Sequence, residues 1–163
     1  MSWHNDLNKL LFYASINFRN VFASDFFYQN RIKWFTNAAL RTELHSYLGG
    51  ISKQLDCPPI IVGGVEDHVH MLARMGRGIT QSDWVKELKR MSSVWVKQQA
   101  QDMEEFSWQA GYGIFSVSAS ALETVEQYIR NQEEHHKKMT FQEEYRVLLQ
   151  KHGVAWDEKY VWE

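Results

Sequence analysis

The segment Val65–Leu72 is the feature that most constrains the fold, because it places two histidines within one short apolar strand. Side chains of a strand alternate between the two faces of a sheet, so His68 and His70 point the same way and the apolar residues that follow them point the other way. Two imidazoles about 7 Å apart on one face can bind a single metal ion. The simpler alternative is a pair of ordinary polar residues on the exposed face of the strand.

The segment between residues 120 and 136 has the pattern of an amphipathic helix, with an apolar stripe formed by Leu122, Val125 and Ile129. Ser120 and Glu123 have the spacing of a capping box, which predicts a helix that begins at Ser120. Tyr128 and Gln132 are four residues apart, so they lie on one face of this helix. A phenol can act as a nucleophile, and an amide oxygen can complete a metal site. The alternative is a tyrosine at the edge of the core and a solvated glutamine.

Hydrophobic periodicity predicts the order strand, helix, strand, strand, helix, strand and helix. The predicted elements are a strand at Leu11–Phe18, a helix at Thr36–Gln54, strands at Ile60–Gly64 and Asp67–Met75, a helix at Ser82–Gln101 capped by Ser82–Asp83, a strand at Ile114–Ser118, the Tyr128 helix, and a tail helix at Phe141–His152. We expect the second and third strands to form an antiparallel hairpin. This order is typical of an α+β fold, a ferredoxin-like βαββαβ sandwich. Its antiparallel four-stranded sheet would carry helices on one face, followed by a C-terminal helix that bears Tyr128.

The length and composition predict one domain with a substantial core. The chain has 163 residues, of which 44% are hydrophobic, so a single domain covering residues 1–163 is expected. The single cysteine, Cys57, excludes an internal disulfide and fits a reducing compartment. No N-terminal segment has the layout of a signal peptide, and no apolar run approaches the roughly 18 residues needed to cross a bilayer. We therefore expect a cytoplasmic protein without a membrane partner.

The charge of the chain argues mildly against nucleic-acid binding. Eighteen basic and twenty acidic side chains give a formal net charge of −2. Binding to nucleic acid depends on lysines and arginines that neutralise phosphates. Some of the basic side chains are nevertheless segregated into two groups, one near the first predicted strand and one on a single helix. These groups are Arg19, Arg31 and Lys33, and Lys86, Lys89, Arg90 and Lys97.

Four blocks of the sequence resemble, in the same order, the single-tyrosine transposases of the insertion-sequence-200-like family, part of the larger group of His-hydrophobe-His nucleases. The blocks are Gly63–His70, Leu88–Ser93, Trp108–Ser118 and Tyr128–Gln132. The resemblance extends from about Leu40 to the C-terminus. The family usually opens with a strand followed by a short basic stretch, whereas residues 17–28 of this chain are aromatic rather than basic.

This resemblance implies a metal-dependent single-strand DNA transposase or nickase, which cleaves and rejoins DNA at hairpin-bearing ends. Tyr128 would be the catalytic nucleophile that forms a 5′-phosphotyrosine. His68, His70 and Gln132 would bind the metal ion, which the resemblance implies is Mg²⁺ or Mn²⁺, although two imidazoles alone would equally suit Zn²⁺ or Ni²⁺. The implied partners are single-stranded DNA with hairpin structure and a second copy of the chain. In such a homodimer the Tyr-bearing helix can complete the site of the partner subunit.

Further candidates for DNA contact are Arg19, Lys86, Lys89, Arg90, Trp108 and Tyr112. The basic side chains would contact phosphates, and the aromatic side chains would stack on bases. The alternatives are a solvated helix face for the basic residues and a plug at the sheet edge for the two aromatic residues.

Three polar residues near these motifs have ordinary interpretations that we favour. Asp67 precedes the first histidine, and we expect it to bond to the backbone of the turn rather than to support a metal site. His135 and His136 lie near the end of the Tyr128 helix, where cationic side chains suit the helix dipole, and we prefer this interpretation to a second metal site.

Two other functions are compatible with the same residues. One is a catalytically idle nucleic-acid-binding protein on the same fold, which would need no metal. The other is a metallohydrolase that uses the two histidines without Tyr128 on a small or nucleotide substrate. The presence of both histidines together with Tyr128 and Gln132 favours the transposase.

Overall fold

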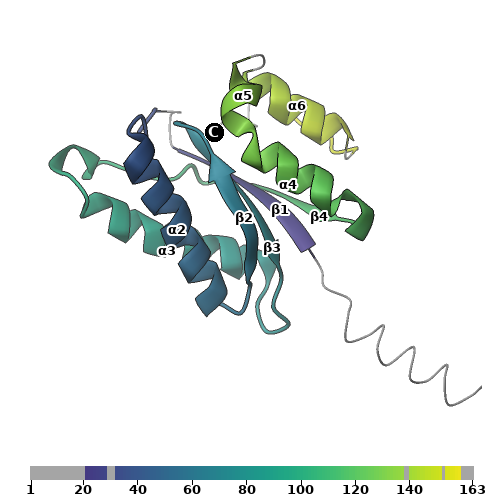
Figure 1. The fold of residues 1–163 in the computed structure, drawn as a ribbon, viewed down its shortest axis with the longest axis horizontal. Helices are drawn as coiled ribbons and strands as arrows, with labels where there is room; N and C mark the ends of the chain where they lie inside the picture. The colour runs from purple at the N-terminus through teal and green to yellow at the C-terminus, as the bar shows by residue number, and fades with distance from the viewer. Residues whose placement is uncertain (1–20, 29–31, 138–139, 152, 159–163) are drawn as a thin grey trace, which may run out of the picture.

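Four antiparallel strands form the centre of the fold, in the spatial order β2-β3-β1-β4. This computed structural model describes residues 21–28, 32–137, 140–151 and 153–158. The strands are β1 (Val21–Phe27), β2 (Pro59–Gly64), β3 (His68–Arg74) and β4 (Gly113–Val117), and the helices are α2 (Ala38–Gln54), α3 (Gln81–Lys97), α4 (Leu122–Arg130), α5 (Gln132–His136) and α6 (Phe141–Lys151). Helices cover both faces of the sheet (Figure 1). The predicted α+β architecture with an antiparallel four-stranded sheet is confirmed.

The alternation of side chains along β3 decides what each face of the sheet carries. β2 pairs with one side of β3 in the predicted antiparallel hairpin, and β1 pairs with the other side so that Asp25 lies opposite His70. Val69 and Met71 belong to the core that lies under α2 and α3. The two histidines of β3 face the opposite way, toward the layer formed by α4, α5 and α6. The assignment of faces predicted from the alternation is therefore confirmed.

α2 and α3 pack on the first face through aliphatic stripes, which contribute Leu44, Leu48 and Ile51 from α2 and Val85, Leu88 and Val96 from α3. Trp84 is fully buried between these helices, and its Nε1 donates to Ser52 Oγ at 3.0 Å. Side chains cap the start of both helices: Asn37 Oδ1 accepts from the backbone of α2, and Thr80 Oγ1 accepts from the backbone nitrogen of Asp83. The cap predicted at Ser82–Asp83 is wrong, because the Thr80 hydroxyl already satisfies the free N–H of the first turn.

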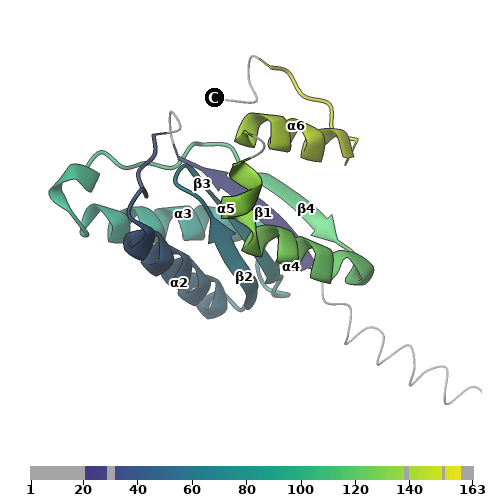
Figure 2. The ribbon, with the colours of Figure 1, turned by 45° about the horizontal axis from the view of Figure 1, so that its top comes forward.

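α4, α5 and α6 form the layer on the opposite face of the sheet (Figure 2). Ile129 of α4 packs against Val21 and Leu72, and Tyr145 of α6 packs edge-on against Phe27, with ring centroids 5.3 Å apart. Both contacts bury apolar surface over the strands that carry the histidines and Asp25. This second layer therefore encloses the polar residues that the strands direct toward it.

The start of α4 differs from the prediction. α4 begins at Leu122, after a 3₁₀ turn at Ala119–Ala121, and no side chain caps it. The capping box expected from Ser120 is not formed, because the Ser120 hydroxyl pairs with the Ser118 hydroxyl at 3.0 Å instead. The residues that precede the helix are already turned, which leaves Ser120 inside the turn rather than at the helix boundary.

Gly63 of β2 allows α4 to lie unusually close to the sheet. A Cβ atom built at this position would lie 2.8 Å from Cγ2 and 2.8 Å from the carbonyl oxygen of Ile129. No side chain fits such a gap without movement of the helix backbone. The close approach holds Tyr128, which precedes Ile129, directly over the strand face that carries the histidines.

The first strand of the described sheet is one that the sequence analysis did not predict. The strand expected at Leu11–Phe18, and Arg19 after it, lie outside the described residues. β1 is instead Val21–Phe27, within the segment interpreted as an aromatic stretch that follows the strand. The physical reason is that β1 lies between β3 and β4 and is covered on both faces, so Phe26 and Phe27 are both buried and no polar alternation marks the strand. Among the described helices, none has the length and apolar character to span a bilayer.

Candidate metal centre and tyrosine site

His68 and His70 form the floor of a buried polar site on β3. Their exposed fractions are 0% and 3%, and their ring centroids lie 4.7 Å apart. Both belong to a strand in the interior of the sheet, so their backbones are fixed by hydrogen bonds to β2 on one side and β1 on the other. The sequence prediction that the two imidazoles share a face and a neighbourhood is met in this geometry.

Gln132 closes the site from above at the first residue of α5. Its Oε1 lies 3.3 Å from His68 Nε2 and 3.1 Å from His70 Nε2. The helix is interrupted at Asn131 (φ −100°, ψ 19°), immediately before Gln132. Because of this break, the chain turns down toward the sheet and the Gln132 side chain becomes almost fully buried. The structure therefore brings together the three residues that the sequence identified as candidate metal ligands.

Two carboxylates orient the histidine rings from behind. His68 Nδ1 donates to Asp67 Oδ1 at 2.7 Å, and His70 Nδ1 donates to Asp25 Oδ1 at 2.6 Å. Ionised carboxylates only accept, so the proton of each neutral ring resides on Nδ1 and the Nε2 lone pair points into the site. Carboxylate–histidine pairs of this kind raise the basicity of metal-binding imidazoles.

The expectation for Asp67 is wrong, since its carboxylate bonds to the His68 ring. Asp67 lies in a bend just before β3, so the alternation of the strand does not fix its side chain on the face opposite His68. Asp25 was not singled out from the sequence. The signal that could have found it is a lone acidic residue within an otherwise apolar strand, where an unpaired charge would be costly to bury.

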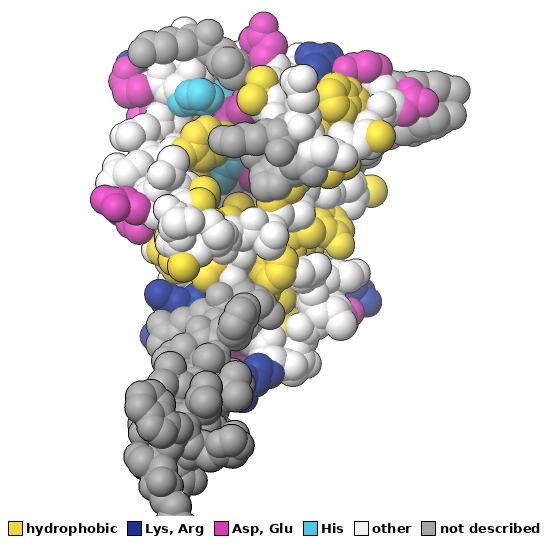
Figure 3. Space-filling view, turned by 90° about the vertical axis from the view of Figure 1, so that its right-hand side faces the viewer, with side chains coloured by type: hydrophobic (Ala, Val, Ile, Leu, Met, Phe, Trp, Pro, Cys, Tyr) yellow, Lys and Arg dark blue, Asp and Glu magenta, His cyan; other side chains and the backbone are white. Residues whose placement is uncertain are grey.

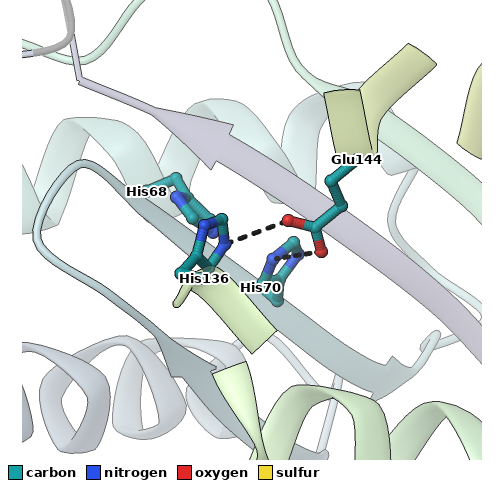
Figure 4. A group of neighbouring side chains, drawn as sticks. All are labelled: His68, His70, His136 and Glu144. Carbon is teal, nitrogen blue, oxygen red and sulfur yellow. Dashed lines mark ion pairs between the residues drawn. The ribbon is translucent and has the colours of Figure 1, made fainter. Parts of the chain in front are cut away.

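His136 and Glu144 complete the cluster from α5 and α6 (Figure 4). His136 Nε2 lies 3.0 Å from Gln132 Oε1 and 3.0 Å from Glu144 Oε2. Glu144 Oε1 accepts from Gln132 Nε2 at 3.2 Å. One donor atom from each of His68, His70, His136 and Glu144 falls within a set in which all atoms lie within 4.8 Å of one another. These four residues form a possible metal-binding cluster, and the Gln132 oxygen lies among them.

The expectation for His136 is therefore wrong, whereas His135 lies outside the cluster. α5 has only five residues, and its end folds over the site instead of pointing to solvent, which carries His136 to the centre. His135 Nε2 lies 3.8 Å from Glu144 Oε1, and its ring lies edge-on to Tyr128. Sequence reasoning missed Glu144 altogether. Its only signal is its position in the first turn of α6, directly before Tyr145, which is also buried.

Burial and neighbouring charges shift the pKa values of all four cluster residues, and the shifts of His68 and His136 favour metal binding. Burial lowers the pKa of His68 and lowers that of His136 to about 4, so both rings are neutral at pH 7. Burial also acts to lower the pKa of His70, but the Asp25 and Glu144 carboxylates and the contact with Gln132 together outweigh it, so the pKa is raised overall. Burial raises the pKa of Glu144 to about 7. Neutral imidazoles are the form of histidine that metals bind.

The atoms at the centre of the cluster are mostly hydrogen-bond acceptors that face one another, an arrangement that suits a bound divalent cation. The Nε2 lone pairs of His68 and His70 face the Gln132 oxygen, which is also an acceptor, and this contact is repulsive unless a proton or a cation intervenes. Within the described residues, one buried oxygen at the site, Asp25 Oδ2, has no hydrogen-bond partner. Buried polar atoms without partners are rare and indicate a missing ion or water. The residues present therefore fit a metal ion.

Tyr128 lies beside this centre on the last turn of α4. Its half-buried ring lies edge-on to the His70 ring, with centroids 5.5 Å apart. Tyr128, His70, Asp25 and Glu144 line one side of a cavity of about 550 Å³, whose remaining walls are mainly apolar. Figure 3 shows this face of the molecule, with histidine side chains (cyan) above a band of hydrophobic side chains (yellow). A ligand in the cavity can therefore reach both the phenol and the cluster.

The basic residues predicted to contact DNA have different surroundings. Lys86 is exposed on α3. Arg90 is paired with Glu87 through two hydrogen bonds of 2.9 and 2.7 Å. Lys89 Nζ donates to the carbonyl oxygens of Gln109, at 2.8 Å, and of the two residues that follow it, and burial lowers its pKa to about 8. The Lys89 charge therefore organises the loop that leads to β4.

The two aromatic candidates also differ. Trp108 is 8% exposed, packs against Phe26, and donates from Nε1 to Ser92 Oγ at 2.9 Å. This placement favours the alternative in which Trp108 closes the edge of the core. Tyr112 is 37% exposed, with Lys89 Nζ lying 5.6 Å from its ring centroid. It precedes Gly113, which pairs with Asp25, so the Tyr112 ring lies near the cluster end of the sheet.

Two histidines on an interior strand of a four-stranded antiparallel sheet, with a tyrosine on α4 and a glutamine on α5 above them, define the class of His-hydrophobe-His proteins with one tyrosine. Residues 24–132 match the family described as "Transposase IS200 like". The matched segment includes β1, the two histidines, Tyr128 and Gln132. The chain belongs to the IS200-like transposase family.

Two solved structures share this fold. One is described as a "putative transposase from deinococcus radiodurans r1"; it has 20% sequence identity and a TM-score of 0.52, over 69% of this chain and 89% of that one. The other is a REP-associated tyrosine transposase bound to a REP hairpin; it has 12% identity and a TM-score of 0.56, over 72% of this chain and 68% of that one. No curated protein matches the sequence.

Proposed function

We propose that the protein is a metal-dependent single-strand DNA transposase that nicks and rejoins DNA through a covalent bond to Tyr128. The observation that carries this proposal is the position of Tyr128 beside the His70 ring, four residues before Gln132, whose amide oxygen meets both histidines of β3. Membership of a transposase family makes DNA the expected substrate.

The proposed chemistry exchanges one phosphodiester bond for another. The Tyr128 phenol oxygen forms a bond to the scissile phosphorus, the bond from phosphorus to the 3′-oxygen breaks, and the phenol proton is transferred so that the leaving strand ends in a 3′-hydroxyl. The product is a 5′-phosphotyrosine with one phosphodiester linkage, as in the substrate. A second 3′-hydroxyl can then displace the tyrosine, so rejoining requires no external energy source.

His68, His70 and Gln132 would hold the metal ion, proposed to be Mg²⁺ or Mn²⁺, which when bound neutralises charge on the scissile phosphate as a Lewis acid. Asp67 and Asp25 hold the two imidazoles in the tautomer and orientation that direct Nε2 into the site. The other walls of the cavity beside the phenol are mainly apolar. Asp25, His68, His70 and Gln132 are each held by β1, β3 or α5.

The proposed substrate is single-stranded DNA with hairpin structure. The REP-associated relative was solved with a REP hairpin bound, which supports this choice of probe. Exposed Lys86 and Tyr112 are the first candidates for contacts to phosphates and bases; Lys89 and Arg90 would need to exchange their present partners. The proposed location is the cytoplasm, and we expect no membrane partner.

A homodimer remains part of the proposal. In the described chain, Tyr128 and the predicted ligands already meet within one protomer, so a partner is not needed to complete the site. We expect size-exclusion chromatography with light scattering to give twice the 19.3 kDa mass. A monomer at micromolar concentration would remove the dimer from the proposal without affecting the chemistry.

Covalent capture tests the proposed function. The protein is incubated with labelled single strands tiled across its flanking genomic DNA and Mn²⁺, and the products are separated on a denaturing gel. We expect a shifted band that disappears with chelator and in Tyr128→Phe. The control is Tyr47→Phe, because Tyr47 stacks on Trp95 in the α2–α3 layer, away from the cluster.

The outcomes of this assay are distinct. An adduct that persists in Tyr128→Phe would refute the assignment of the nucleophile. Binding without any adduct, and without an effect of chelator, would favour the idle nucleic-acid-binding protein. Cleavage that depends on metal but never gives an adduct would favour a metallohydrolase that uses the histidines alone.

A further inference from the structure

We infer that His136 is a third nitrogen ligand of the metal centre and that it makes the site selective for an imidazole-binding transition-metal ion such as Mn²⁺ over Mg²⁺. The inference rests on the metal site of the proposed function and specifies which ion that site takes. It concerns a residue of α5 that lies outside the pair on β3 and one helical turn beyond Gln132.

Three imidazole nitrogens converge on one oxygen. His68 Nε2, His70 Nε2 and His136 Nε2 lie 3.3, 3.1 and 3.0 Å from Gln132 Oε1. Donor atoms bound to one ion at about 2.1 Å lie about 3.0 Å apart when adjacent in an octahedron and about 3.4 Å apart in a tetrahedron. The spacing of all three nitrogens from the amide oxygen is therefore that of neighbouring ligands in one coordination sphere.

The local structure holds His136 at this point. The break at Asn131 starts α5 over the site, and a spacing of four residues returns the His136 side chain to the same face as Gln132. The His136 ring lies 4.7 Å from the His68 ring, centroid to centroid. Glu144 of α6 lies on the other side of the His136 nitrogen, at 3.0 Å. The His136 nitrogen thus lies between the amide oxygen and a carboxylate that can also bind a cation.

The number of nitrogen donors decides which ion the site prefers. Mg²⁺ prefers oxygen ligands and keeps several waters, so a cluster with three imidazoles suits it poorly. First-row transition metals accept imidazole, and their affinity for nitrogen-containing sites exceeds that of Mg²⁺. With His68 and His70 alone, oxygen ligands could still form most of the coordination sphere. The third imidazole shifts the balance toward nitrogen.

A purely structural role for His136 makes a different prediction. In that case its Nε2–H donates a hydrogen bond to Gln132 Oε1 and joins α5 to α6 through Glu144. Removal of His136 would then weaken binding of every divalent ion to the same extent, since it would only loosen the site. Selectivity among metal ions therefore distinguishes a role of His136 as a metal ligand from a purely structural role.

The experiment is a set of metal titrations on the full chain without DNA. Metal-free protein is titrated calorimetrically with Mg²⁺ and Mn²⁺ for the wild type, His136→Gln and His135→Gln. We expect the wild type to bind Mn²⁺ about ten-fold or more tighter than Mg²⁺, and His136→Gln to lose about ten-fold or more in Mn²⁺ affinity with little change for Mg²⁺. His135→Gln removes the adjacent imidazole, whose Nε2 lies 3.8 Å from Glu144, and should keep the wild-type selectivity.

Pulsed electron paramagnetic resonance of bound Mn²⁺ gives an independent readout, because it detects the nitrogens coordinated to the ion. We expect three coupled imidazoles in the wild type and two in His136→Gln, with circular dichroism unchanged. Equal affinities for Mg²⁺ and Mn²⁺ in the wild type, or the same nitrogen couplings in both proteins, would overturn the inference. So would an equal loss for both ions in His136→Gln.

These titrations involve neither DNA nor the tyrosine, so their failure is distinguishable from failure of the proposed function. A covalent adduct together with unselective metal binding would leave the transposase proposal intact and remove the role of His136. Selective Mn²⁺ binding without any adduct would leave the role of His136 intact and contradict the transposase proposal. It would support a metal-dependent activity that does not use Tyr128.

Discussion

Asp25→Asn tests most directly whether the carboxylate behind His70 supports metal binding at the cluster. Asp25 lies on β1 directly opposite His70, and its Oδ1 accepts from His70 Nδ1 at 2.6 Å. Both side chains are 4% exposed, so water screens the pair very little. Asparagine keeps the shape of the aspartate and removes its charge. The substitution therefore tests the carboxylate with minimal change in packing.

The expected magnitude follows from the role of the pair. Loss of a carboxylate behind a metal-binding histidine costs about 10- to 100-fold in metal affinity, or about 1.4 to 2.7 kcal/mol. Burial of the Asp25–His70 pair places the expected loss toward the upper end of that range. Asp67→Asn removes the matching carboxylate behind His68, but the Asp67 side chain is 23% exposed, so we expect a smaller loss.

The assay is calorimetric titration of metal-free protein with Mn²⁺ at pH 7.5. Asp102→Asn serves as the control, because it removes an exposed carboxylate in the 3₁₀ turn after α3, away from the cluster. Circular dichroism establishes that each variant is folded. The reasoning is refuted if Asp25→Asn binds Mn²⁺ as tightly as the wild type, or if Asp67→Asn has the larger effect.

The remaining predictions concern stability. Gly63→Ala should lower the free energy of unfolding by about 1–3 kcal/mol, because the new Cβ would lie 2.8 Å from Ile129. Gly50→Ala should raise it by up to about 1 kcal/mol, because no atom lies within 4 Å of the new Cβ. Urea unfolding measures both changes, and equal effects would contradict the packing argument. Burial lowers the pKa of His45 to about 4, so the unfolded state binds the extra proton first and stability falls as the pH drops from 6.5 toward 4. His45→Gln should remove up to about 3 kcal/mol of this loss in the free energy of unfolding. Urea unfolding at pH 7.5, pH 5 and pH 4 measures the change, and an unchanged pH dependence would show that His45 is not responsible.

Local periodicity predicted most of the fold. The alternation around His68 identified β3 and its two faces, and the apolar stripes of α2, α3 and α6 identified those helices, because each pattern is set by contacts with one core. β1 was not identified from the sequence because it is covered on both faces and therefore shows no alternation. Its buried Phe26 and Phe27 look the same in sequence as any aromatic stretch.

The outer part of the site could not be predicted because it depends on pairing and on the path of the chain. Asp25 reaches His70 only through the register of β1 against β3. His136 reaches the cluster only because the helix breaks at Asn131, and Glu144 only because α6 returns across the sheet. None of these events leaves a local periodic signal. Short spacings along the chain, i to i+2 for His68 and His70 and i to i+4 for Tyr128 and Gln132, identified these four residues.

The break at Asn131 has a mechanical consequence for the proposed chemistry. Tyr128 and Gln132 flank it, and Gln132 Nε2 donates back to the Tyr128 carbonyl at 3.5 Å, so the proposed nucleophile and the amide ligand belong to one short segment. The imidazoles of His68 and His70 belong to the sheet. Gly63 sets the distance between the sheet and α4 through its contact with Ile129. Movement of α4 away from β2 would therefore withdraw the phenol and one metal ligand together. Competence for cleavage and completeness of the metal site thus depend on the same packing contact.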